Sequence, residues 1–384
     1  MKRIFYFTLI LSFFCCLFFN TTAYGYSDSK AAALPITAPS AVLMEKKTGQ
    51  VIYEKNGSQR RSPASITKIM TMLLIVEDIE SGKISTDDIV SASPRAASFG
   101  GSCVFLEEGE RMSVDDMLKC IAVVSANDCA VAMAEHLCGD EGVFVERMNE
   151  RAAELGLENT HFTNCTGLFE NKDHYTTAQD VACLSRELIS HPTIKKYTCI
   201  WMDSIRDGKF GLSNTNKLVS RYEGCTGLKT GYTEAAKYCL SATAERDGIE
   251  FIAVIMGSKD PELRNSDATA LLNYAFSNYS LCSLRPQEKP APIKVEMGEK
   301  NCLELQYMGE EYGLIAKGSG DISYSHNLPE KLRAPVKKGQ ILGELIVSSG
   351  DSELRRIPIG AAETVDRIGF WGIFTIFGRS LLGI

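Results

Sequence analysis

The sequence predicts a mixed α/β fold in which a helical block packs on an antiparallel sheet, followed by a small all-β domain and a terminal amphipathic helix. Strand-like segments occur near residue 40 and again between residues 225 and 256, whereas residues 113–188 are mostly helical. Strands at both ends with helices between them indicate one sheet built from distant parts of the chain. A proline-rich stretch, residues 286–292, then separates this domain (residues 40–283) from a strand-rich region at residues 284–361.

Residues 1–25 have the pattern of a secretory signal peptide. Lys2 and Arg3 precede an apolar run, and Ala23-Tyr24-Gly25 provides small residues at a cleavage point. Because the apolar run is short for a membrane span, an uncleaved membrane helix is the less favoured alternative. Residues 26–39 form a polar linker, and we expect an exported protein.

The composition argues against a nucleic-acid partner and against a disulfide framework. The 384-residue chain has a formal net charge of −7, so the basic surface that nucleic-acid binding requires is missing. Two of the 13 cysteines lie in the signal peptide, and the remaining eleven are odd in number and form no C-x-x-C pair. We expect most of them, such as Cys120, Cys129 and Cys239, to be small buried side chains.

The first elements of the domain are a hairpin and a buried helix. Residues 41–53 predict a β-hairpin with its turn at Lys47-Thr48-Gly49. Ser62 followed by Pro63 predicts a helix start, with Ser62 as the N-cap and Pro63 as the first helical residue. The helix continues to about Val76 and is apolar nearly all round, which predicts a buried central helix.

The later elements complete the predicted domain. Helices are expected over residues 114–122 and 128–138. Strands at residues 238–244 and 249–256 flank Arg246-Asp247-Gly248, which is a hairpin-turn sequence. Residues 264–279 then predict an amphipathic helix that closes the domain.

Residues 362–384 predict an amphipathic helix that anchors the protein to a membrane surface through residues 363–384. This segment is rich in aromatic and aliphatic side chains, but its uncharged stretch between Arg367 and Arg379 has only 11 residues. A membrane-spanning helix needs about 20, so an interfacial helix is favoured. A helix packed on the protein's own core or on a partner is the alternative. Together, the predicted export and the predicted terminal helix indicate a location at the outer face of the cytoplasmic membrane or in the cell wall.

Three short motifs occur in order along the chain: Ser65-Ile66-Thr67-Lys68, Ser125-Ala126-Asn127 and Lys229-Thr230-Gly231. They spell S-x-x-K, S-x-N and K-T-G, the set found in penicillin-binding proteins and serine β-lactamases. Each is weak alone, but together they predict a serine acyl-transfer enzyme whose proton chemistry uses lysine. The chain has no G-x-S-x-G elbow, and none of its five histidines has zinc-ligand spacing, so we expect no metal and no cofactor.

Ser65 is the predicted nucleophile and Lys68 is its predicted base. A lysine three residues later lies on the same helix face, and a serine hydroxyl is a poor nucleophile until a base removes its proton. Lysine is a base only when neutral, so we expect burial and the nearby cation of Lys229 to lower the pKa of Lys68. The N–H of Ser65 at the helix start is expected to stabilise an oxyanion, although a Ser62 cap would compete for that N–H.

The other two motifs offer groups that bind a substrate. Ser125 and Asn127 are expected in a loop at the cleft, where the hydroxyl relays a proton and the amide holds a carbonyl; a plain helix cap is the alternative. Lys229 and Thr230 offer a cation and a hydroxyl to a carboxylate. Gly231 lets a substrate backbone approach the strand closely.

The segments Ser62–Thr71, Gly100–Glu110 and Gly227–Thr233 resemble the low-molecular-mass D-alanyl-D-alanine carboxypeptidases, which are serine peptidases among the penicillin-binding proteins. The resemblance covers residues from about 40 to 283 and continues into the β domain and the terminal helix. It implies a β-lactamase/transpeptidase-like fold and an acyl-enzyme on Ser65. It also implies an oxyanion hole of backbone N–H groups from Ser65 and Tyr232, and substrate contacts from Thr230, Gly231, Thr233 and Arg264.

The resemblance implies an enzyme that removes the terminal D-alanine from peptidoglycan stem peptides and is acylated by β-lactam antibiotics. A serine β-lactamase is the nearest alternative, with Glu158 or Glu170 as the glutamate that drives deacylation. A penicilloyl-binding sensor or scaffold that does not turn over is a second alternative, and endopeptidase activity is a minor variant. The segment Asn164–Leu168 departs from the family's commoner N-P-x-G-L, which leaves the shape of that loop open.

Overall fold

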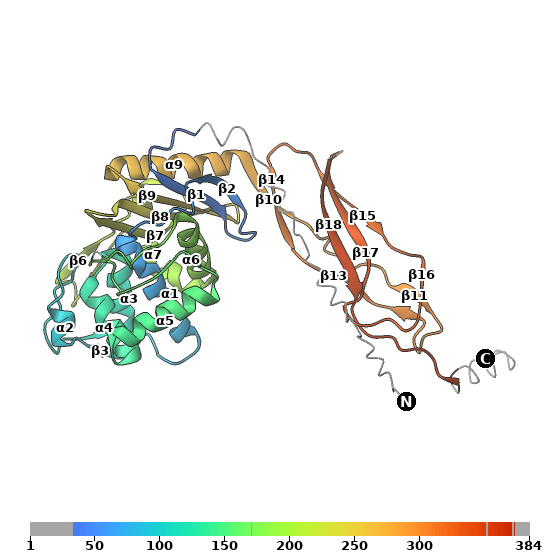
Figure 1. The fold of residues 1–384 in the computed structure, drawn as a ribbon, viewed down its shortest axis with the longest axis horizontal. Helices are drawn as coiled ribbons and strands as arrows, with labels where there is room; N and C mark the ends of the chain where they lie inside the picture. The colour runs from blue at the N-terminus through green and yellow to red at the C-terminus, as the bar shows by residue number, and fades with distance from the viewer. Residues whose placement is uncertain (1–33, 170, 351, 371, 373–384) are drawn as a thin grey trace, which may run out of the picture.

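A five-stranded antiparallel sheet forms the centre of the N-terminal part of the chain (Figure 1). The structure is a computed structural model, and it describes residues 34–169, 171–350, 352–370 and 372. The strand order is β2-β1-β9-β8-β7, with β1 (Ser40–Glu45), β2 (Val51–Lys55), β7 (Cys225–Thr233), β8 (Lys237–Arg246) and β9 (Ile249–Ser258). β1 pairs with β9 along its whole length, so distant parts of the chain share one sheet, as predicted.

Helices cover both faces of this sheet (Figure 1). α9 (Pro261–Asn278) lies over one face, and a block of helices lies beneath the other. The helices before α9 are η2 (Ala64–Thr67), α1 (Lys68–Glu80), α2 (Pro94–Ala97), α3 (Val114–Val123), α4 (Asn127–Cys138), α5 (Glu141–Glu154), α6 (Ala178–Ser190), η3 (Pro192–Ile194), α7 (Lys195–Thr198) and α8 (Leu218–Arg221). Two short two-stranded ribbons lie among them: β3 (Ile89–Ser91) with β4 (Arg111–Ser113), and β5 (Met202–Ile205) with β6 (Phe210–Ser213).

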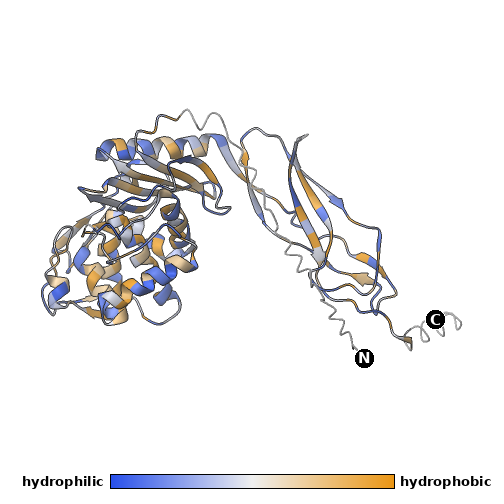
Figure 2. Cartoon of the chain, in the orientation of Figure 1, coloured by the Kyte–Doolittle hydropathy of each residue, from blue (hydrophilic) through white to orange (hydrophobic). Residues whose placement is uncertain are grey.

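The apolar core lies on both sides of the sheet. Every residue of α1 from Lys68 to Val76 is buried, which confirms the predicted central helix. Figure 2 shows apolar residues along the central strands and the helices beneath them. Because both faces are covered, β9 is buried throughout, and β8 is buried along most of its length. The sheet and α1 therefore form a rigid frame for the residues at their ends.

The predicted helix start at Ser62 is wrong. Pro63 is the N-cap of the 3-10 helix η2, no side chain caps that helix, and α1 begins only at Lys68. The turn is closed by the N–H of Ile66, which donates to Pro63 O at 3.1 Å. A tight 3-10 turn at a helix N-terminus is common. Ser62 therefore does not compete for the N–H of Ser65.

Two other helical segments differ from the prediction. α9 begins earlier than residue 264, because the side chain of Asp260 accepts from the N–H groups at the start of the helix and Pro261 occupies the first helical position. The described residues between α5 and α6, 155–169 and 171–177, form no helix. This irregular segment includes residues 164–168, which pack against the start of α1.

The chain after α9 forms a separate group of strands (Figure 1). They are β10 (Tyr279–Ser283), β11 (Ile293–Glu296), β12 (Cys302–Leu303), β13 (Leu305–Tyr307), β14 (Tyr312–Ala316), β15 (Ile322–Asn327), β16 (Lys331–Arg333), β17 (Ile341–Ser349) and β18 (Ser352–Ala361). They form sheets of order β13-β18-β17-β15 and β12-β11-β16 and a ribbon of β10 with β14. The predicted combination of an antiparallel sheet, a helical block and a small β domain is confirmed.

The predicted terminal helix lies mostly outside the described residues, as does the predicted signal peptide. Val365 and Arg367 form β-bridges to Val336 and Gly298, so the chain is still extended there, and described helical positions begin at Phe370. No helix within the described ranges is both long and apolar enough to cross a membrane.

The cysteines of the described chain are all free. Cys120, Cys129 and Cys239 are fully buried, as predicted for small apolar side chains.

Candidate active site

The predicted nucleophile and base lie together where η2 meets α1. Ser65 is partly buried in the 3-10 turn, and Lys68 is the fully buried first residue of α1. The 3-10 geometry brings residues three apart onto one side of the turn. Lys68 Nζ consequently lies 3.1 Å from Ser65 Oγ.

Lys68 has two further polar partners, and both are acceptors. Its Nζ donates to Asn127 Oδ1 at 2.6 Å and to the backbone oxygen of Thr166 at 2.9 Å. A neutral amine has two N–H bonds and one lone pair, so these acceptors leave the lone pair directed at Ser65 Oγ. Burial lowers the pKa of Lys68 to about 7, although the carboxylate of Asp128 acts in the opposite direction. Lys68 is thus a base near neutral pH.

The loop Asn164–Leu168 holds the Thr166 carbonyl in place. Asn164 Oδ1 accepts from the N–H groups of Thr166 and Gly167, which folds the loop tightly. Gly167 has φ +75°, and a Cβ there would lie 1.8 Å from Ala64 O, so the loop backbone packs directly on the nucleophile turn. The loop that sequence reasoning left open is therefore part of the site.

Two buried polar side chains support this arrangement from behind. Glu141, at the start of α5, accepts from the N–H of Cys165 and also pairs with Arg95. His174 accepts from the N–H of Thr163 through Nδ1 and donates through Nε2 to Thr67 Oγ1 at 2.8 Å. Burial lowers the pKa of His174 to about 4, so the ring is neutral at pH 7.

Ser125 lies between α3 and α4, Asn127 is the first residue of α4, and neither side chain caps that helix. The N-cap residue is Ala126 and has no side-chain cap bond, so the alternative of a plain helix cap is wrong. Asn127 Nδ2 donates to Gly100 O at 2.7 Å, which directs its Oδ1 to Lys68. Ser125 has φ +64°, and its buried Oγ has no hydrogen-bond partner among the described residues.

The K-T-G motif lies on β7, at the edge of the sheet. In the described chain β7 pairs on one side only, with β8. Lys229 is buried, its Nζ donates to Thr230 O at 3.0 Å, and Thr230 Oγ1 donates to Thr215 Oγ1 at 2.8 Å. Burial lowers the pKa of Lys229 well below its ordinary value, and repulsion by Lys68 and Arg264 lowers it further.

Gly231 brings this edge strand against the nucleophile. A Cβ at Gly231 would lie 2.9 Å from Pro63 O and 3.1 Å from the nitrogen of Ser65. A side chain at this position would therefore displace the strand from the η2 turn. Because Gly231 has no side chain, the backbone of β7 lies beside the N–H of Ser65.

The remaining predicted residues lie around the end of β7 and the start of α9. Tyr232 is half exposed, and its ring packs on Tyr238 with 4.4 Å between centroids. Thr233 Oγ1 accepts from the N–H of Ala236, which closes the turn after the strand. Arg264 is buried on α9 with its pKa lowered by burial, and it donates to Asn265 Oδ1.

The structure therefore joins Ser65, Lys68 and Asn127 by hydrogen bonds and brings Lys229 and Arg264 into their electrostatic surroundings. Ser125 forms no hydrogen bond with them in the described chain. Residues 27–260 match the family described as D-alanyl-D-alanine carboxypeptidase, and residues 284–367 match the C-terminal domain of penicillin-binding protein 5.

The chain belongs to the D-alanyl-D-alanine carboxypeptidase family. It is thus a serine-type carboxypeptidase of the penicillin-binding proteins. It is 43% identical over 361 residues to the D-alanyl-D-alanine carboxypeptidase DacF of Bacillus subtilis, which covers 92% of each chain. It is 30% identical over 366 residues to DacC of Escherichia coli, covering 92% of this chain and 90% of that protein.

Solved structures share the fold of this carboxypeptidase. Penicillin-binding protein 5 from Haemophilus influenzae superposes with a TM-score of 0.79 at 29% identity, covering 86% of this chain and 98% of that chain. Penicillin-binding protein D2 from Listeria monocytogenes in its ampicillin-bound form superposes with a TM-score of 0.59 at 30% identity. That superposition covers 63% of this chain and 99% of the other.

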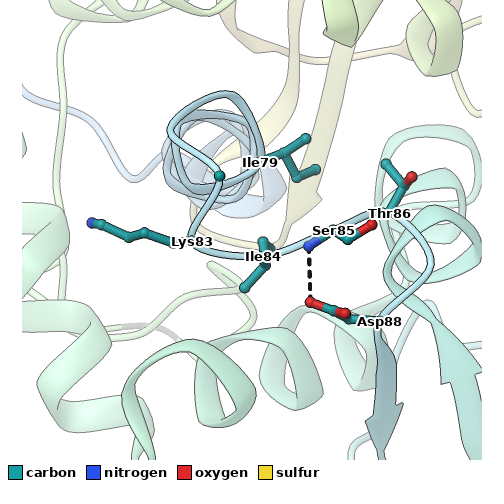
Figure 3. Close-up of a pocket in the computed structure, with 7 residues that line it drawn as sticks. Ile79, Lys83, Ile84, Ser85, Thr86 and Asp88 are labelled. Carbon is teal, nitrogen blue, oxygen red and sulfur yellow. Dashed lines mark hydrogen bonds between the residues drawn. The ribbon is translucent and has the colours of Figure 1, made fainter.

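One other cavity and one cluster of acidic and histidine side chains lie away from the nucleophile of the carboxypeptidase. A cavity of about 480 Å³ follows the end of α1 (Figure 3), where Lys83 points away and Ser85 N–H donates to Asp88. Glu77, Glu187 and His191 form a group with metal-ligand spacing, but both glutamates accept from Arg151. Glu77 is nine residues beyond Lys68, about 14 Å along the helix axis. Neither the cavity nor the cluster contributes a group to Ser65.

Proposed function

We propose that this carboxypeptidase removes the terminal D-alanine from peptidoglycan stem peptides through an acyl-enzyme on Ser65. The observation that carries the proposal is the 3.1 Å approach of Ser65 Oγ to a buried lysine whose other N–H bonds are occupied. Neutral Lys68 takes the proton of Ser65, and Oγ attacks the carbonyl carbon of the penultimate D-alanine. The proton then passes to the leaving amine, with the unpartnered hydroxyl of Ser125 available to relay it.

The N–H groups of Ser65 and Tyr232 would form the oxyanion hole. The close packing of Gly231 on the nitrogen of Ser65 supports this assignment, because it leaves the backbone of β7 next to the η2 turn. Two backbone donors fixed by a strand edge and a helix start need no reorganisation as charge develops on the substrate oxygen. Water then attacks the acyl-enzyme, with Lys68 as the base.

The terminal carboxylate of the substrate would bind at Lys229, Thr230 and Arg264, with Thr233 and Gly231 beside the peptide. Two buried cations that repel each other and have no described carboxylate partner favour an anionic ligand. The edge of β7 offers free backbone groups to an extended peptide, and Asn127 offers its amide to a substrate carbonyl. β-Lactams would acylate Ser65 from the same site.

A serine β-lactamase remains the weaker candidate. The hydrogen-bond partners of Lys68 within the described chain are a hydroxyl, an amide oxygen and a backbone oxygen, and none is a carboxylate. Glu158 is exposed on the loop after α5, and Glu170 lies outside the described residues. We also propose export by the N-terminal segment and attachment to the outer face of the membrane through residues 363–384.

The test is steady-state release of D-alanine from a peptide ending in D-Ala-D-Ala. We expect the wild type to release D-alanine over repeated turnovers and Ser65→Ala to release none. We also expect penicillin to form a stoichiometric adduct with the wild type, which releases hydrolysed penicillin only slowly even when the drug is in excess. A single stoichiometric burst of D-alanine without turnover would indicate a sensor, and rapid turnover of nitrocefin would indicate a β-lactamase. Either result would contradict the proposal.

A further inference from the structure

A second cavity, of about 670 Å³, adjoins the nucleophile turn. It is lined by Arg60–Ser62, by the loop 171–175 and by Ala235. Ser62 directly precedes Pro63, whose oxygen contacts β7, and Ala235 is two residues beyond the end of that strand. The cavity therefore lies at the Thr233 end of β7, whereas Lys229 lies in the middle of that strand.

This position relates the cavity to the substrate, on the basis of the proposed function. A peptide along the edge of β7 with its carboxylate at Lys229 and Thr230 directs its upstream residues toward Ala235. β7 ends at Thr233, which is three residues beyond Thr230 and roughly 10 Å along the strand at about 3.3 Å per residue, and Ala235 lies in the turn that follows. The residues two or three positions before the scissile bond thus reach the cavity.

The lining carries an excess of positive charge that the protein does not neutralise. Arg60, Arg61 and Lys172 face one carboxylate, that of Asp173. In the described chain none of these three cations pairs with an acidic side chain, although the protein has a net charge of −7. Unpaired cations gathered at one cavity of an acidic protein favour an anionic ligand.

The two arginines are held at the cavity rather than free in solvent. Arg60 lies over the ring of Tyr175 at 4.4 Å and donates to Asn159 Oδ1 at 3.1 Å. Arg61 has a buried Nε without any acceptor in the described chain. Buried donors without partners are rare in native proteins, so this one is consistent with a ligand that supplies the acceptor.

We propose that this cavity is a subsite for the acyl-donor side of the substrate and that it binds a carboxylate carried two or three residues before the scissile bond. The carboxylate pairs with Arg61 and Lys172, and Arg60 frames the opening. The site would make the enzyme prefer acidic stem peptides to their amidated counterparts.

The experiment compares two peptides that end in D-Ala-D-Ala and differ only in a carboxylate or a carboxamide at those upstream positions. For the wild type we expect kcat/KM for D-alanine release to be at least about fivefold higher with the acid, which is the effect of one partly exposed charge pair. In Arg61→Gln and in Lys172→Gln the ratio should fall toward one. Lys172 is suited to this test because its side chain forms no described hydrogen bond or ion pair.

Arg333→Gln is the matched control, since Arg333 is an exposed arginine of the β domain, and it should keep the wild-type ratio. A wild-type ratio near one, or an unchanged ratio in both variants, would overturn the subsite. Protection of Ser65 from fluorescent penicillin by the same two peptides needs no turnover. It therefore tests the subsite separately if D-alanine is not released and the proposed function fails.

Discussion

Replacing Asn127 with aspartate would add a negative charge beside the base. Asn127 Oδ1 lies 2.6 Å from Lys68 Nζ, and both residues are buried. At an effective dielectric constant of about 20, two unit charges at that distance interact by about 6 kcal/mol. The cost of burying the carboxylate offsets part of this, and we take about half as the net effect. The pKa of Lys68 should then rise by about two units from its value of about 7.

The direction of this effect on the rate follows from the role of Lys68. A higher pKa keeps Lys68 protonated at pH 7, so the fraction of enzyme with a neutral base falls from about one half to about 1%, or about 50-fold. The acid limb of the acylation rate should move from a midpoint near pH 7 in the wild type to about pH 9 in Asn127→Asp.

The assay is the rate of Ser65 acylation by a fluorescent penicillin, measured from pH 5 to pH 10 for both proteins. The maximal rate should also fall, because the amide hydrogen that bonds Gly100 O is lost, so the midpoint and not the amplitude is the readout. Asn127→Leu is the control, since it removes the same contacts without adding charge, and its midpoint should not rise. An unmoved midpoint in a folded Asn127→Asp protein would show that Lys68 is not the titrating base.

Three further predictions concern the supports of the site and the membrane segment. Because the pKa of His174 is about 4 in the folded protein and about 6.5 when unfolded, stability should fall by about 3 kcal/mol as the pH drops from 6.5 to 4. Denaturant unfolding should find this loss in the wild type and not in His174→Gln. Gly167→Ala should cost about 3 kcal/mol or more by collision with Ala64 O, whereas Gly156→Ala, with a similar φ of +70° and no neighbour within 4 Å, should cost about 1 kcal/mol. Equal losses would refute the packing argument. Deleting residues 363–384 should stop flotation with vesicles and spare activity on a soluble peptide, and equal flotation of both forms would refute the anchor.

The residues that sequence reasoning found are those whose chemistry depends on short spacing. Ser65 and Lys68 are one turn apart, and the S-x-N and K-T-G motifs each place their groups within three residues. Such groups stay together whatever the exact helix geometry, so the wrong start at Ser62 did not affect the assignment of Ser65. The fold class could be predicted for a similar reason, since the strand-like segments of β1, β8 and β9 were visible at both ends of the domain.

The residues that were missed act through contacts distant in sequence. Thr166 contributes a backbone oxygen to Lys68, 98 residues away, and no side-chain pattern marks such an acceptor. Glu141 looks like an ordinary acid in the first turn of a helix, and only packing reveals that it accepts from Cys165 N–H. His174 is one of five histidines without zinc-ligand spacing, and no sequence pattern marks its hydrogen bond to Thr67. The departure of Asn164–Leu168 from the commoner N-P-x-G-L pattern is the one sequence feature that singles out this loop.

The measurement that tests the account most directly is peptide mapping of the penicilloyl adduct by mass spectrometry. The protein should gain one penicilloyl group, and the modified peptide should carry it on Ser65, because Ser65, alone among the serines of the described residues, combines a buried lysine at 3.1 Å with the adjacent backbone of β7. Ser65→Ala should remain unlabelled under the same conditions. A label on any other residue, or a labelled Ser65→Ala protein, would contradict the assignment of the nucleophile.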